Sequence, residues 1–542
     1  MTTSSPLASP LASALAEALP RLCAPAAELS VELLDLIRAL AAALEAGALE
    51  LDFAASTPEG LDAALWPGAY RQAVAQSPLA HGPDAPLVIT GERLRWRRWH
   101  LELERTLSNL VERARQPLPQ TPAPADLEAV RRQAERAGLD PIQQQAVTAA
   151  LHHKLVLLSG GPGTGKTSTV VQLLAAVLQR QPGLRLRLAA PTGKAAARLR
   201  EAIERGCRSL PPALVEPLLA APCSTLHRLL ESSGERFGRN ARQPLDLDLL
   251  VVDEVSMVDL PLMAALLEAL PEHSRLVLVG DPAQLPPVGP GPVLQELMRP
   301  EWLPQLGPAA VELRTAYRNA GAIAAVAAQL RQAGAEPLAA IRRELEALTA
   351  SDNLSWRQAP PQAAPAVVLN ALREHQQQLA ALAAALVVSS DGEPDPEAAA
   401  ALLAELERCV LLTPVRQGRW GVEGIHRQLL GEAAGRSPAH WPLGTPVLNQ
   451  RNLSEQELAN GDVGVLVGEG ESRRVLVAGG RLLHPARLGP VEPALALTVH
   501  KSQGSQYGTV WLLLPPGRDW DARLLYTGLT RARERAWLIT PD

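Results

Sequence analysis

The sequence predicts an α/β protein with two parallel β-sheets, a small β-rich insertion and a mainly helical N-terminal region. Short apolar runs alternate with helical stretches from about residue 126 onward, which is typical of strand–helix–strand units in a parallel sheet. Polar and glycine-rich motifs follow several of these runs where a strand would end. Hydrophobic residues at 47% and charged residues at 20% favour a globular chain with several cores.

The first 115 residues are predicted to form a separate domain, residues 1–115. Apolar positions repeat at helical spacing over Val31–Leu49, and Pro86–Trp96 predicts two short strands around Thr90-Gly91. The proline-rich segment Gln116–Ala125 is polar and short. It predicts an extended linker over 116–125.

Two α/β units follow, predicted at 126–318 and 319–542. The first is expected to have strands at Leu155–Leu158, Leu186–Ala190, Leu249–Val252 and Leu276–Val279. The second is expected to have strands at Val410–Thr413, Ala494–Val499, Val510–Leu514 and Trp537–Thr540. Within the second unit, residues 320–408 are expected to be helical apart from an acidic turn at Ser389–Pro396. Asn460-Gly461-Asp462 and the β-like runs Val463–Val467 and Arg474–Val477 indicate an inserted β-domain over about 445–490.

Residues 160–167, Gly-Gly-Pro-Gly-Thr-Gly-Lys-Thr, match the phosphate-binding pattern G-x-x-x-x-G-K-[ST] between a predicted strand and a helical stretch, Ser168–Leu178. Backbone N–H groups of the loop and of the helix N-terminus favour a phosphate. Lys166 can reach the β- and γ-phosphates, and the Thr167 hydroxyl can ligate Mg²⁺. The predicted nucleotide-binding residues are Gln143, Gly160, Gly161, Pro162, Gly163, Thr164, Gly165, Lys166, Thr167 and Ser168, with Gln143 expected to read an adenine edge.

Two carboxylates follow the apolar run Leu249–Val252. Asp253 is expected to ligate Mg²⁺ with Thr167, and Glu254 is expected to orient the attacking water as a general base. The loop after the next strand, Gly280–Val288, is stiffened by three prolines. Gln284 in this loop can hydrogen-bond both the γ-phosphate and the catalytic water, so it can report whether that phosphate is present.

Two arginines are candidates to act across a cleft between the units. Arg318 ends the segment Leu313–Arg318, and Arg531 lies in Tyr526–Arg533 before the last predicted strand. An arginine supplied to a transferring phosphoryl group accelerates the reaction by about 10³–10⁵. The predicted catalytic residues are Lys166, Asp253, Glu254, Gln284, Arg318 and Arg531.

Three polar segments at predicted strand ends are candidates for contacts with a nucleic-acid backbone: Pro191–Lys194, Thr225–His227 and Thr498–Tyr507. Thr, Lys, His and amide groups hold backbone phosphates without reading base sequence. The predicted DNA-binding residues are Thr192, Lys194, His227, Thr498, His500 and Lys501. The stretch Arg93–Trp99 mixes basic and aromatic residues, which suits either a nucleic acid or a protein partner. We favour the protein interface.

The order of these motifs resembles that of superfamily 1 DNA helicases of the RecD type, the α subunits of the bacterial RecBCD enzyme, exodeoxyribonuclease V. The motifs are Gln143, the phosphate loop, PTGKAAA, Asp253-Glu254, GDPAQLPPVG, the arginine of AYR, TVHKSQG and YTGLTRAR. The resemblance runs from about residue 86 to the end and includes 412–422 and Asn460-Gly461-Asp462. It implies two RecA-like motor lobes, an SH3-like insertion in the second lobe and an N-terminal domain that docks onto partner subunits.

The resemblance also implies an ATP-dependent, Mg²⁺-dependent motor that moves 5′→3′ on single-stranded DNA. Such a motor is a subunit of a helicase–nuclease that acts in double-strand break repair and homologous recombination. RecB-like and RecC-like partners would complete a heterotrimer, with the nuclease in a partner chain. Two features depart from the family: Gln506 stands where an acidic residue is usual, and the segment after Arg318 is short.

Two alternatives stay open. A stand-alone RecD-type helicase would unwind DNA without partners, but no helix-hairpin-helix motif of those longer proteins is recognised in the sequence, which favours the complex-bound subunit. An assembly module that binds nucleotide without translocating would be expected to have a degraded catalytic set. Here Glu254, Gln284, Arg318 and Arg531 are all present.

Composition argues against other classes. Four scattered cysteines form no C-x-x-C pair, which argues against a zinc site or a disulfide framework and fits a reducing cytosol. The first basic residue, Arg21, lies behind the apolar N-terminal stretch, unlike in a signal peptide, and no run is long enough to span a membrane. We therefore expect a cytoplasmic protein without membrane contact. With a net charge of −5, any contact with nucleic acid must come from a local groove.

Overall fold

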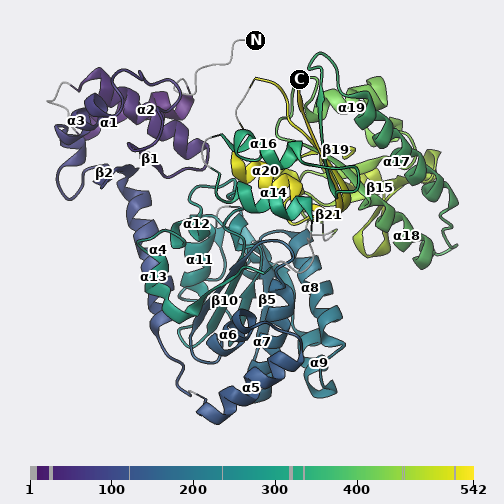
Figure 1. The fold of residues 1–542 in the computed structure, drawn as a ribbon, viewed down its shortest axis with the longest axis horizontal. Coiled ribbons are helices and arrows are strands. Elements are labelled where there is room, and N and C mark those ends of the chain that lie inside the picture. The colour runs from purple at the N-terminus through teal and green to yellow at the C-terminus, as the bar shows by residue number, and fades with distance from the viewer. Residues whose placement is uncertain are drawn as a thin grey trace.

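The computed structural model describes residues 9–23, 29–120, 122–234, 236–315, 321–333, 336–453, 456, 458–517 and 520–542. An N-terminal module, a first lobe and a second lobe can be followed in Figure 1, coloured from purple through blue and teal to green and yellow. Each lobe contains a parallel sheet, of six strands in the first and five in the second. These features confirm the predicted fold class.

The N-terminal module combines helices with a three-stranded antiparallel sheet in the order β1-β3-β2. Its elements are α1 (Pro10–Cys23), α2 (Val31–Glu45), β1 (Glu50–Asp52), α3 (Gly68–Ala75), β2 (Leu87–Thr90), β3 (Arg93–Trp96) and α4 (Arg97–Arg115). The Ser30 hydroxyl accepts a hydrogen bond from the Leu33 N–H and so starts α2. The two strands expected within Pro86–Trp96 are present as β2 and β3.

Helix α4 leaves this module and runs along the first lobe beside α11 and α13 (Figure 1). Leu103, Leu107 and Leu110 on its apolar face are buried in the same core as residues of β4, β9 and β10. The last helix before the proline-rich segment therefore covers one face of the first lobe's sheet. The helix joins the module to the lobe through a shared core.

The first lobe has the strand order β11-β4-β10-β9-β5-β6, with all neighbours parallel. Its strands are β4 (Leu155–Gly160), β5 (Leu186–Ala190), β6 (Cys223–Thr225), β9 (Leu249–Val252), β10 (Arg275–Gly280) and β11 (Ala310–Leu313), with a separate hairpin of β7 (Ser232–Ser233) and β8 (Arg236–Phe237). Its helices are α5 (Pro124–Arg136), α6 (Pro141–Ala149), α7 (Lys166–Arg180), α8 (Gly193–Cys207), α9 (Pro212–Ala220), α10 (Leu226–Leu229), α11 (Leu260–Ala269), α12 (Val293–Leu297) and α13 (Leu303–Leu306). All four predicted strands are present, and β6 and β11 extend the sheet at its two edges.

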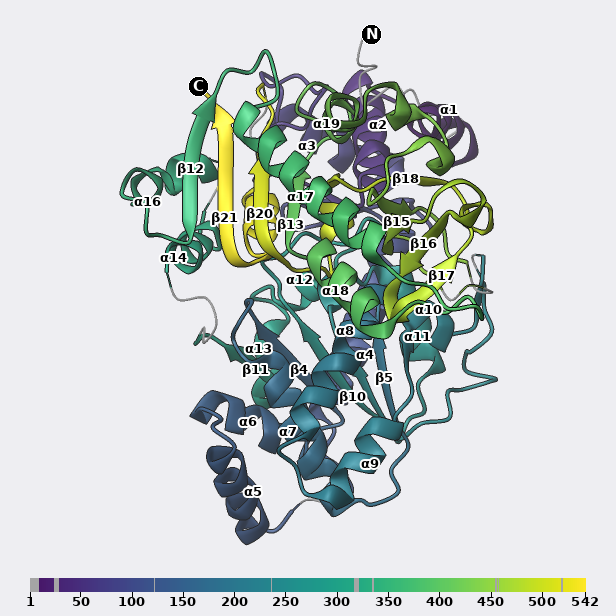
Figure 2. The same ribbon diagram turned by 90° about the vertical axis from the view of Figure 1, so that its right-hand side faces the viewer.

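The second lobe has the parallel strand order β12-β21-β20-β13-β19. Its strands are β12 (Leu354–Ala359), β13 (Cys409–Thr413), β19 (Ala496–Thr498), β20 (Tyr507–Leu513) and β21 (Ala532–Pro541). Its helices are α14 (Ala322–Leu330), α15 (Pro337–Ala340), α16 (Arg342–Glu346), α17 (Ala366–Ala385), α18 (Pro396–Leu406), α19 (Val422–Leu430) and α20 (Ala522–Leu529). Helix α17 lies across one face of this sheet in Figure 2, and α14 and α20 pack on the other face.

The inserted β-domain is a five-stranded antiparallel sheet in the order β17-β16-β15-β14-β18. Its strands are β14 (Pro446–Asn449), β15 (Val463–Val467), β16 (Arg474–Val477), β17 (Arg481–Leu483) and β18 (Val491–Pro493). Strands β15 and β16 have the bounds expected from sequence. Strand β19 is shorter than predicted because the chain completes β18 first and enters the parallel sheet only at Ala496. In the described part of the chain, we find no helix with the length and apolar character needed to cross a membrane.

Candidate ATP site and cleft between the lobes

The phosphate loop joins buried strand β4 to helix α7, and its glycines are required by its shape. Gly163 and Gly165 adopt φ values of +76° and +80°, which L side chains rarely adopt. A Cβ on Gly160 would lie 2.9 Å from the Leu313 carbonyl oxygen. Lys166 Nζ donates to the carbonyl oxygens of Gly160 at 2.6 Å and Gly161 at 3.0 Å. The loop therefore curls around the lysine at the mouth of a phosphate site.

Gln143 supports this loop from helix α6. It is 3% exposed, and its Nε2 donates to the Thr164 carbonyl oxygen at 3.1 Å. Its Oε1 accepts from the Asp140 N–H at 3.0 Å as part of a capping box. Both the nitrogen and the oxygen of the Gln143 amide thus bond the protein. The adenine contact expected for Gln143 stays a prediction, and it would require one of these two hydrogen bonds to be replaced by a bond to the base.

Asp253 and Glu254 follow β9 directly, as expected. Burial raises the pKa of Asp253, the neighbouring Glu254 carboxylate raises it further, and Lys166 acts in the opposite direction. Glu254 adopts a left-handed φ of +52°, and its N–H donates to Asp253 Oδ1 at 2.8 Å. Two adjacent, partly buried carboxylates that line the cleft favour a bound cation. Thr167 lines the same cleft, so the three residues fit Mg²⁺.

The loop that follows β10 connects the two lobes. The Leu285 N–H donates to the Thr527 hydroxyl at 2.8 Å, and its carbonyl oxygen accepts from Gln503 Nε2 at 3.1 Å. Gln284 beside it is buried, and its Nε2 lies 3.5 Å from Asp281 Oδ2. Its Oε1 has no hydrogen-bond partner among the described residues. Gln284, the residue predicted to sense the γ-phosphate, is therefore followed by Leu285, whose backbone N–H and carbonyl oxygen both bond side chains of the second lobe.

Of the two predicted arginines, the structure describes one. Arg318 lies outside the described residues. Arg531 is 3% exposed, and its guanidinium donates to the carbonyl oxygens of Thr527 at 3.2 Å and Ser505 at 3.3 Å. Within the described chain no bond joins Arg531 to the phosphate loop, so its role in catalysis stays a prediction.

A cleft of about 2150 Å³ lies between the lobes and the inserted sheet. Its lining includes nine Lys and Arg residues and seven Asp and Glu residues, a small positive excess in a chain whose net charge is −5. The basic residues are Lys194, Arg198, Arg200, Arg205, Arg228, Arg481, Lys501, Arg531 and Arg533, and the acidic ones are Glu201, Glu231, Asp253, Glu254, Asp259, Glu407 and Asp462. Tyr507 is its aromatic lining residue. The cleft therefore has the small local excess of positive charge that a contact with DNA would require.

Five of the six predicted DNA-binding residues line this cleft: Thr192, Lys194, His227, His500 and Lys501. The sixth, Thr498, does not line it. Its hydroxyl accepts a hydrogen bond from the Lys501 N–H at 3.3 Å and so shapes the turn that carries this lysine. Lys501 Nζ in turn donates to Asn460 Oδ1 at 2.8 Å. The structure therefore gives Thr498 a positioning contact, and its contact with DNA stays a prediction.

The lobes also meet at one end of this cleft. Arg198 of α8 donates to the carbonyl oxygen of Gln506 at 3.2 Å and to Glu407 Oε1 at 3.4 Å. Lys194 lies over the Tyr507 ring at 5.4 Å from its centroid. Since the backbone of Gln506 makes this contact, the departure from the usual acidic residue leaves the junction in place.

The basic and aromatic stretch Arg93–Trp99 is buried at its centre, over Leu94–Trp96, and Arg98 is exposed. Arg95 is 5% exposed, donates to Glu50 through Nε at 2.8 Å, and lies 3.5 Å from Glu296 of the first lobe. Arg299 completes the cluster through Glu50 at 2.7 Å. These contacts hold the N-terminal module on the first lobe.

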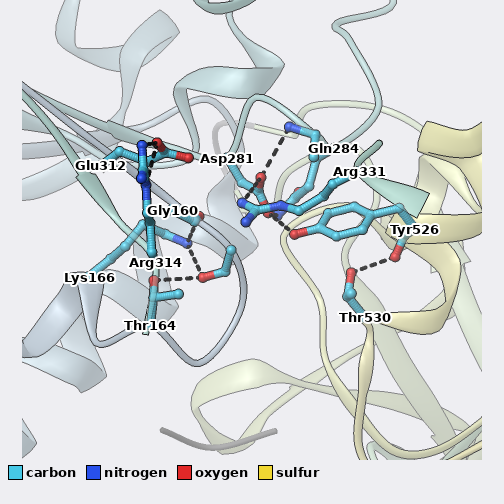
Figure 3. A network of polar contacts seen from close by, with 12 residues as sticks. Gly160, Thr164, Lys166, Asp281, Gln284, Glu312, Arg314, Arg331, Tyr526 and Thr530 are labelled. Atoms are coloured by element: carbon cyan, nitrogen blue, oxygen red, sulfur yellow. Dashed lines mark hydrogen bonds and ion pairs between the residues drawn. The ribbon is translucent and has the colours of Figure 1, made fainter. Parts of the chain in front are cut away.

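Three residues near the phosphate loop were not assigned a role from sequence. Asp281, Tyr526 and Arg331 come from two lobes and meet near the phosphate loop (Figure 3). A Cβ built on Gly161 would lie 3.0 Å from the Tyr526 hydroxyl and 3.3 Å from Arg331 Nη2. The Tyr526 hydroxyl donates to Asp281 Oδ2 at 2.7 Å, and Arg331 Nη2 lies 3.5 Å from Asp281 Oδ1. Asp281 and Tyr526 stand inside recognised motifs, but Arg331 lies in an Ala/Leu/Gln-rich helical stretch with no local signal.

Comparisons with known proteins give matches across the chain. Family models described as "AAA domain" and "UvrD-like helicase C-terminal domain" match residues 143–290 and 493–539. A "RecBCD enzyme subunit RecD" from Mycolicibacterium smegmatis is 38% identical over 416 residues, covering 73% of this chain and 70% of that protein. The protein of the same name from Mycobacterium tuberculosis is 34% identical over 543 residues, covering 96% and 89%.

Two further similarities are more limited. An "ATP-dependent RecD2 DNA helicase" from Deinococcus radiodurans is 33% identical over 468 residues, covering 83% of this chain and 56% of that protein. A solved structure of Bacteroides Pif1 bound to single-stranded DNA covers 78% of this chain and 95% of that one, with a TM-score of 0.37 at 16% identity.

Two parallel-sheet lobes, a phosphate loop in the first and the family matches in both define the class: the chain is an ATP-dependent DNA helicase of superfamily 1. Within that class, the chain is 34–38% identical to two RecD subunits and covers 70% and 89% of their lengths, which shows the family. The chain belongs to the RecD family of RecBCD enzyme subunits.

Proposed function

We propose that this helicase moves 5′→3′ along single-stranded DNA as one subunit of a heterotrimer with RecB-like and RecC-like chains, acting in double-strand break repair and homologous recombination. The observation that carries the proposal is the loop after β10, which contains Gln284 and bonds Leu285 to Thr527 and Gln503 of the second lobe. If Gln284 contacts the terminal phosphate, nucleotide state and lobe position would be connected through this one short segment.

ATP and Mg²⁺ are the proposed cofactors. Lys166 would hold the β- and γ-phosphates, with Gln143 beside the adenine, while Thr167 and Asp253 would hold Mg²⁺, which neutralises the charge that develops on the phosphates. Glu254 would orient the attacking water, and Gln284 would bond it and the γ-phosphate through the amide whose Oε1 has no partner in the described chain. Arg531 would supply positive charge from the second lobe, and Arg318, which lies outside the described residues, stays a predicted second source of charge.

The strand would run through the cleft and be gripped mainly by its backbone. Lys194, His227, His500 and Lys501 line the cleft from both lobes. ATP binding would close the lobes, hydrolysis would release Leu285 and its partners, and the grips on the two sides would alternate. One aromatic side chain in the lining favours phosphate contacts over base stacking.

The test is steady-state ATP hydrolysis by the full chain, alone and with its partner subunits, with and without single-stranded DNA. We expect stimulation by DNA and its loss in Lys166→Gln, because the variant removes the ammonium group that the loop curls around and that would bind the phosphates. The matched control is Lys154→Gln, a lysine just before β4 that bonds Gln116 and the Glu272 carbonyl oxygen. ATP hydrolysis by Lys166→Gln at the wild-type rate would refute the site.

The same preparation distinguishes the alternatives. Unwinding of substrates with only a 5′ or only a 3′ single-stranded tail reports polarity, and we expect activity on the 5′ tail. Processive unwinding by the chain alone would favour a stand-alone helicase like the Deinococcus radiodurans relative. ATP turnover unaffected by DNA, both alone and in the complex, would favour an assembly module.

A further inference from the structure

Arg331, which directly follows α14, reaches the phosphate loop from the second lobe (Figure 3). A Cβ built on Gly161 would lie 3.3 Å from Arg331 Nη2 and 3.4 Å from its Cζ. The guanidinium also lies over the Tyr526 ring at 5.7 Å from the centroid. Its side chain keeps 28% of its surface exposed. The charge is therefore at the loop and still accessible to a ligand.

The guanidinium is held there by a buried carboxylate. Asp281 has a side chain with 0% exposure and accepts hydrogen bonds from the Tyr526 hydroxyl at 2.7 Å and the Ala283 N–H at 3.1 Å. A buried carboxylate requires such partners. Arg331 Nη2 lies 3.5 Å from Asp281 Oδ1, a distance longer than a tight charge-assisted hydrogen bond. Asp281 thus orients the guanidinium without engaging its full donor set.

Two cations consequently approach Gly161, each from a different lobe. Lys166 Nζ lies 3.0 Å from the Gly161 carbonyl oxygen, on a helix of the first lobe. Arg331 approaches the same residue from the second lobe. Gln284, which bonds Asp281 at 3.5 Å, has the unpartnered buried Oε1 described above. Donors of both lobes, Lys166 and Arg331, therefore converge at Gly161 of the phosphate loop, and the Gln284 amide lies beside the carboxylate that holds one of them.

We propose that Arg331 is a catalytic arginine of the second lobe, and that its guanidinium contacts the terminal phosphate of bound ATP while Asp281 and Tyr526 hold it in place. The inference rests on the proposed ATP site at Lys166. It makes lobe closure and hydrolysis interdependent through a side chain that belongs to no recognised motif. When the lobes separate, α14 and α20 carry Arg331 and Tyr526 away from the phosphate loop together.

A purely structural role predicts a different outcome. If Arg331 only clamped the lobes together through Asp281, its loss would weaken every nucleotide complex alike. A contact with the terminal phosphate instead selects the triphosphate. The ratio of the affinities for a triphosphate analogue and for ADP therefore separates the two roles.

The experiment uses the full chain with its partner subunits and three variants: Arg331→Met, Arg331→Lys and Arg342→Met. Arg331→Met keeps an unbranched side chain about as long as the aliphatic stem of arginine and removes the charged guanidinium. We expect kcat with single-stranded DNA to fall by about 10²-fold or more, because arginines in this role contribute about 10³–10⁵. We expect affinity for fluorescent ATPγS to fall about tenfold, with affinity for fluorescent ADP unchanged, since about 1.4 kcal/mol corresponds to one lost charged contact.

Arg331→Lys should recover part of kcat, because a positive charge remains near the phosphate. Arg342→Met is the control, an exposed arginine of the neighbouring α16, and should leave both affinities and kcat unchanged. Equal losses for ATPγS and ADP, or a kcat within twofold of wild type in Arg331→Met, would overturn the inference. Wild type that binds ATPγS no better than Lys166→Gln would instead refute the proposed ATP site itself.

Discussion

His426 is buried where α19 meets β19, and its Nε2 accepts a hydrogen bond from the Ala496 N–H at 3.1 Å. Burial lowers the pKa of this imidazole from 6.5 to about 4, with Glu492 acting against the shift and Arg416 supporting it. An acceptor nitrogen cannot carry a proton, so protonation also removes the bond to Ala496. The hydrogen bond that holds the first residue of β19 therefore depends on pH.

The sign follows from the two pKa values. The unfolded chain takes up a proton near pH 6.5, whereas the folded chain resists it until about pH 4, so His426 costs stability as the pH falls through this window. At pH 5 the loss amounts to about 2 kcal/mol. We expect His426→Gln, which keeps an acceptor, to reduce the fall in thermal midpoint between pH 7.5 and pH 5. Equal falls in wild type and variant would contradict this assignment.

At the scale of elements, the N-terminal module contacts the loop that carries Gln284. The Gly291 N–H donates to the Gly47 carbonyl oxygen at 3.0 Å, and a Cβ on Gly47 would lie 3.2 Å from the Val288 carbonyl oxygen. Beside this contact, Glu50 binds both Arg95 and Arg299. A module expected to dock on partners thus touches the segment that links nucleotide and lobes.

Glu50→Ala should destabilise this junction strongly. It removes the carboxylate shared by two arginines and leaves Arg95, 5% exposed, with a single longer ion pair to Glu296. Loss of one partner from a buried ion pair costs about 3–5 kcal/mol. We expect a lower thermal midpoint and faster proteolysis between module and lobe. Glu92→Ala is the matched control, because its pair with Arg71 is exposed at 49% and 44% and should contribute less than about 1 kcal/mol.

Sequence predicted the elements whose pattern is local. Strand β9 and Asp253-Glu254 are adjacent in the chain, and the phosphate loop defines its own strand and helix. Strand β6 was missed because its three residues, Cys-Ser-Thr, show no apolar run. Edge strand β12 was missed because its sequence, LSWRQA, is mixed and only half-buried. Its pairing with β21 depends on residues nearly two hundred positions away.

The site divides in the same way. Lys166, Gln284 and the five expected DNA contacts that line the cleft could be singled out from sequence because each stands in a motif near a strand end. Arg331 could not, because its proximity to Gly161 is created by the contact between α14 and α20 and by the docking of one lobe on the other. Such a position has no signature in the sequence around it.

For the whole molecule, charge is distributed unevenly. The chain carries a net charge of −5, whereas the cleft lining has two more cations than anions. Because the chain as a whole is negatively charged, its outer surface would repel DNA phosphates, and we expect the DNA strand to bind at the cleft. Affinity should therefore depend on the few lysines and arginines that meet phosphates and be weakened by salt.

Salt dependence then identifies these cations individually. The slope of log affinity against log salt for single strands is about −0.7 for each phosphate neutralised, so Lys501→Gln should make it shallower by about 0.7. Lys194→Gln should do the same from the other lobe, since both residues line the cleft. Arg342→Gln, on the exposed face of α16, should leave the slope unchanged. Weaker binding by Lys501→Gln at an unchanged slope would mean that this lysine orders the cleft through Asn460 and does not itself meet a phosphate.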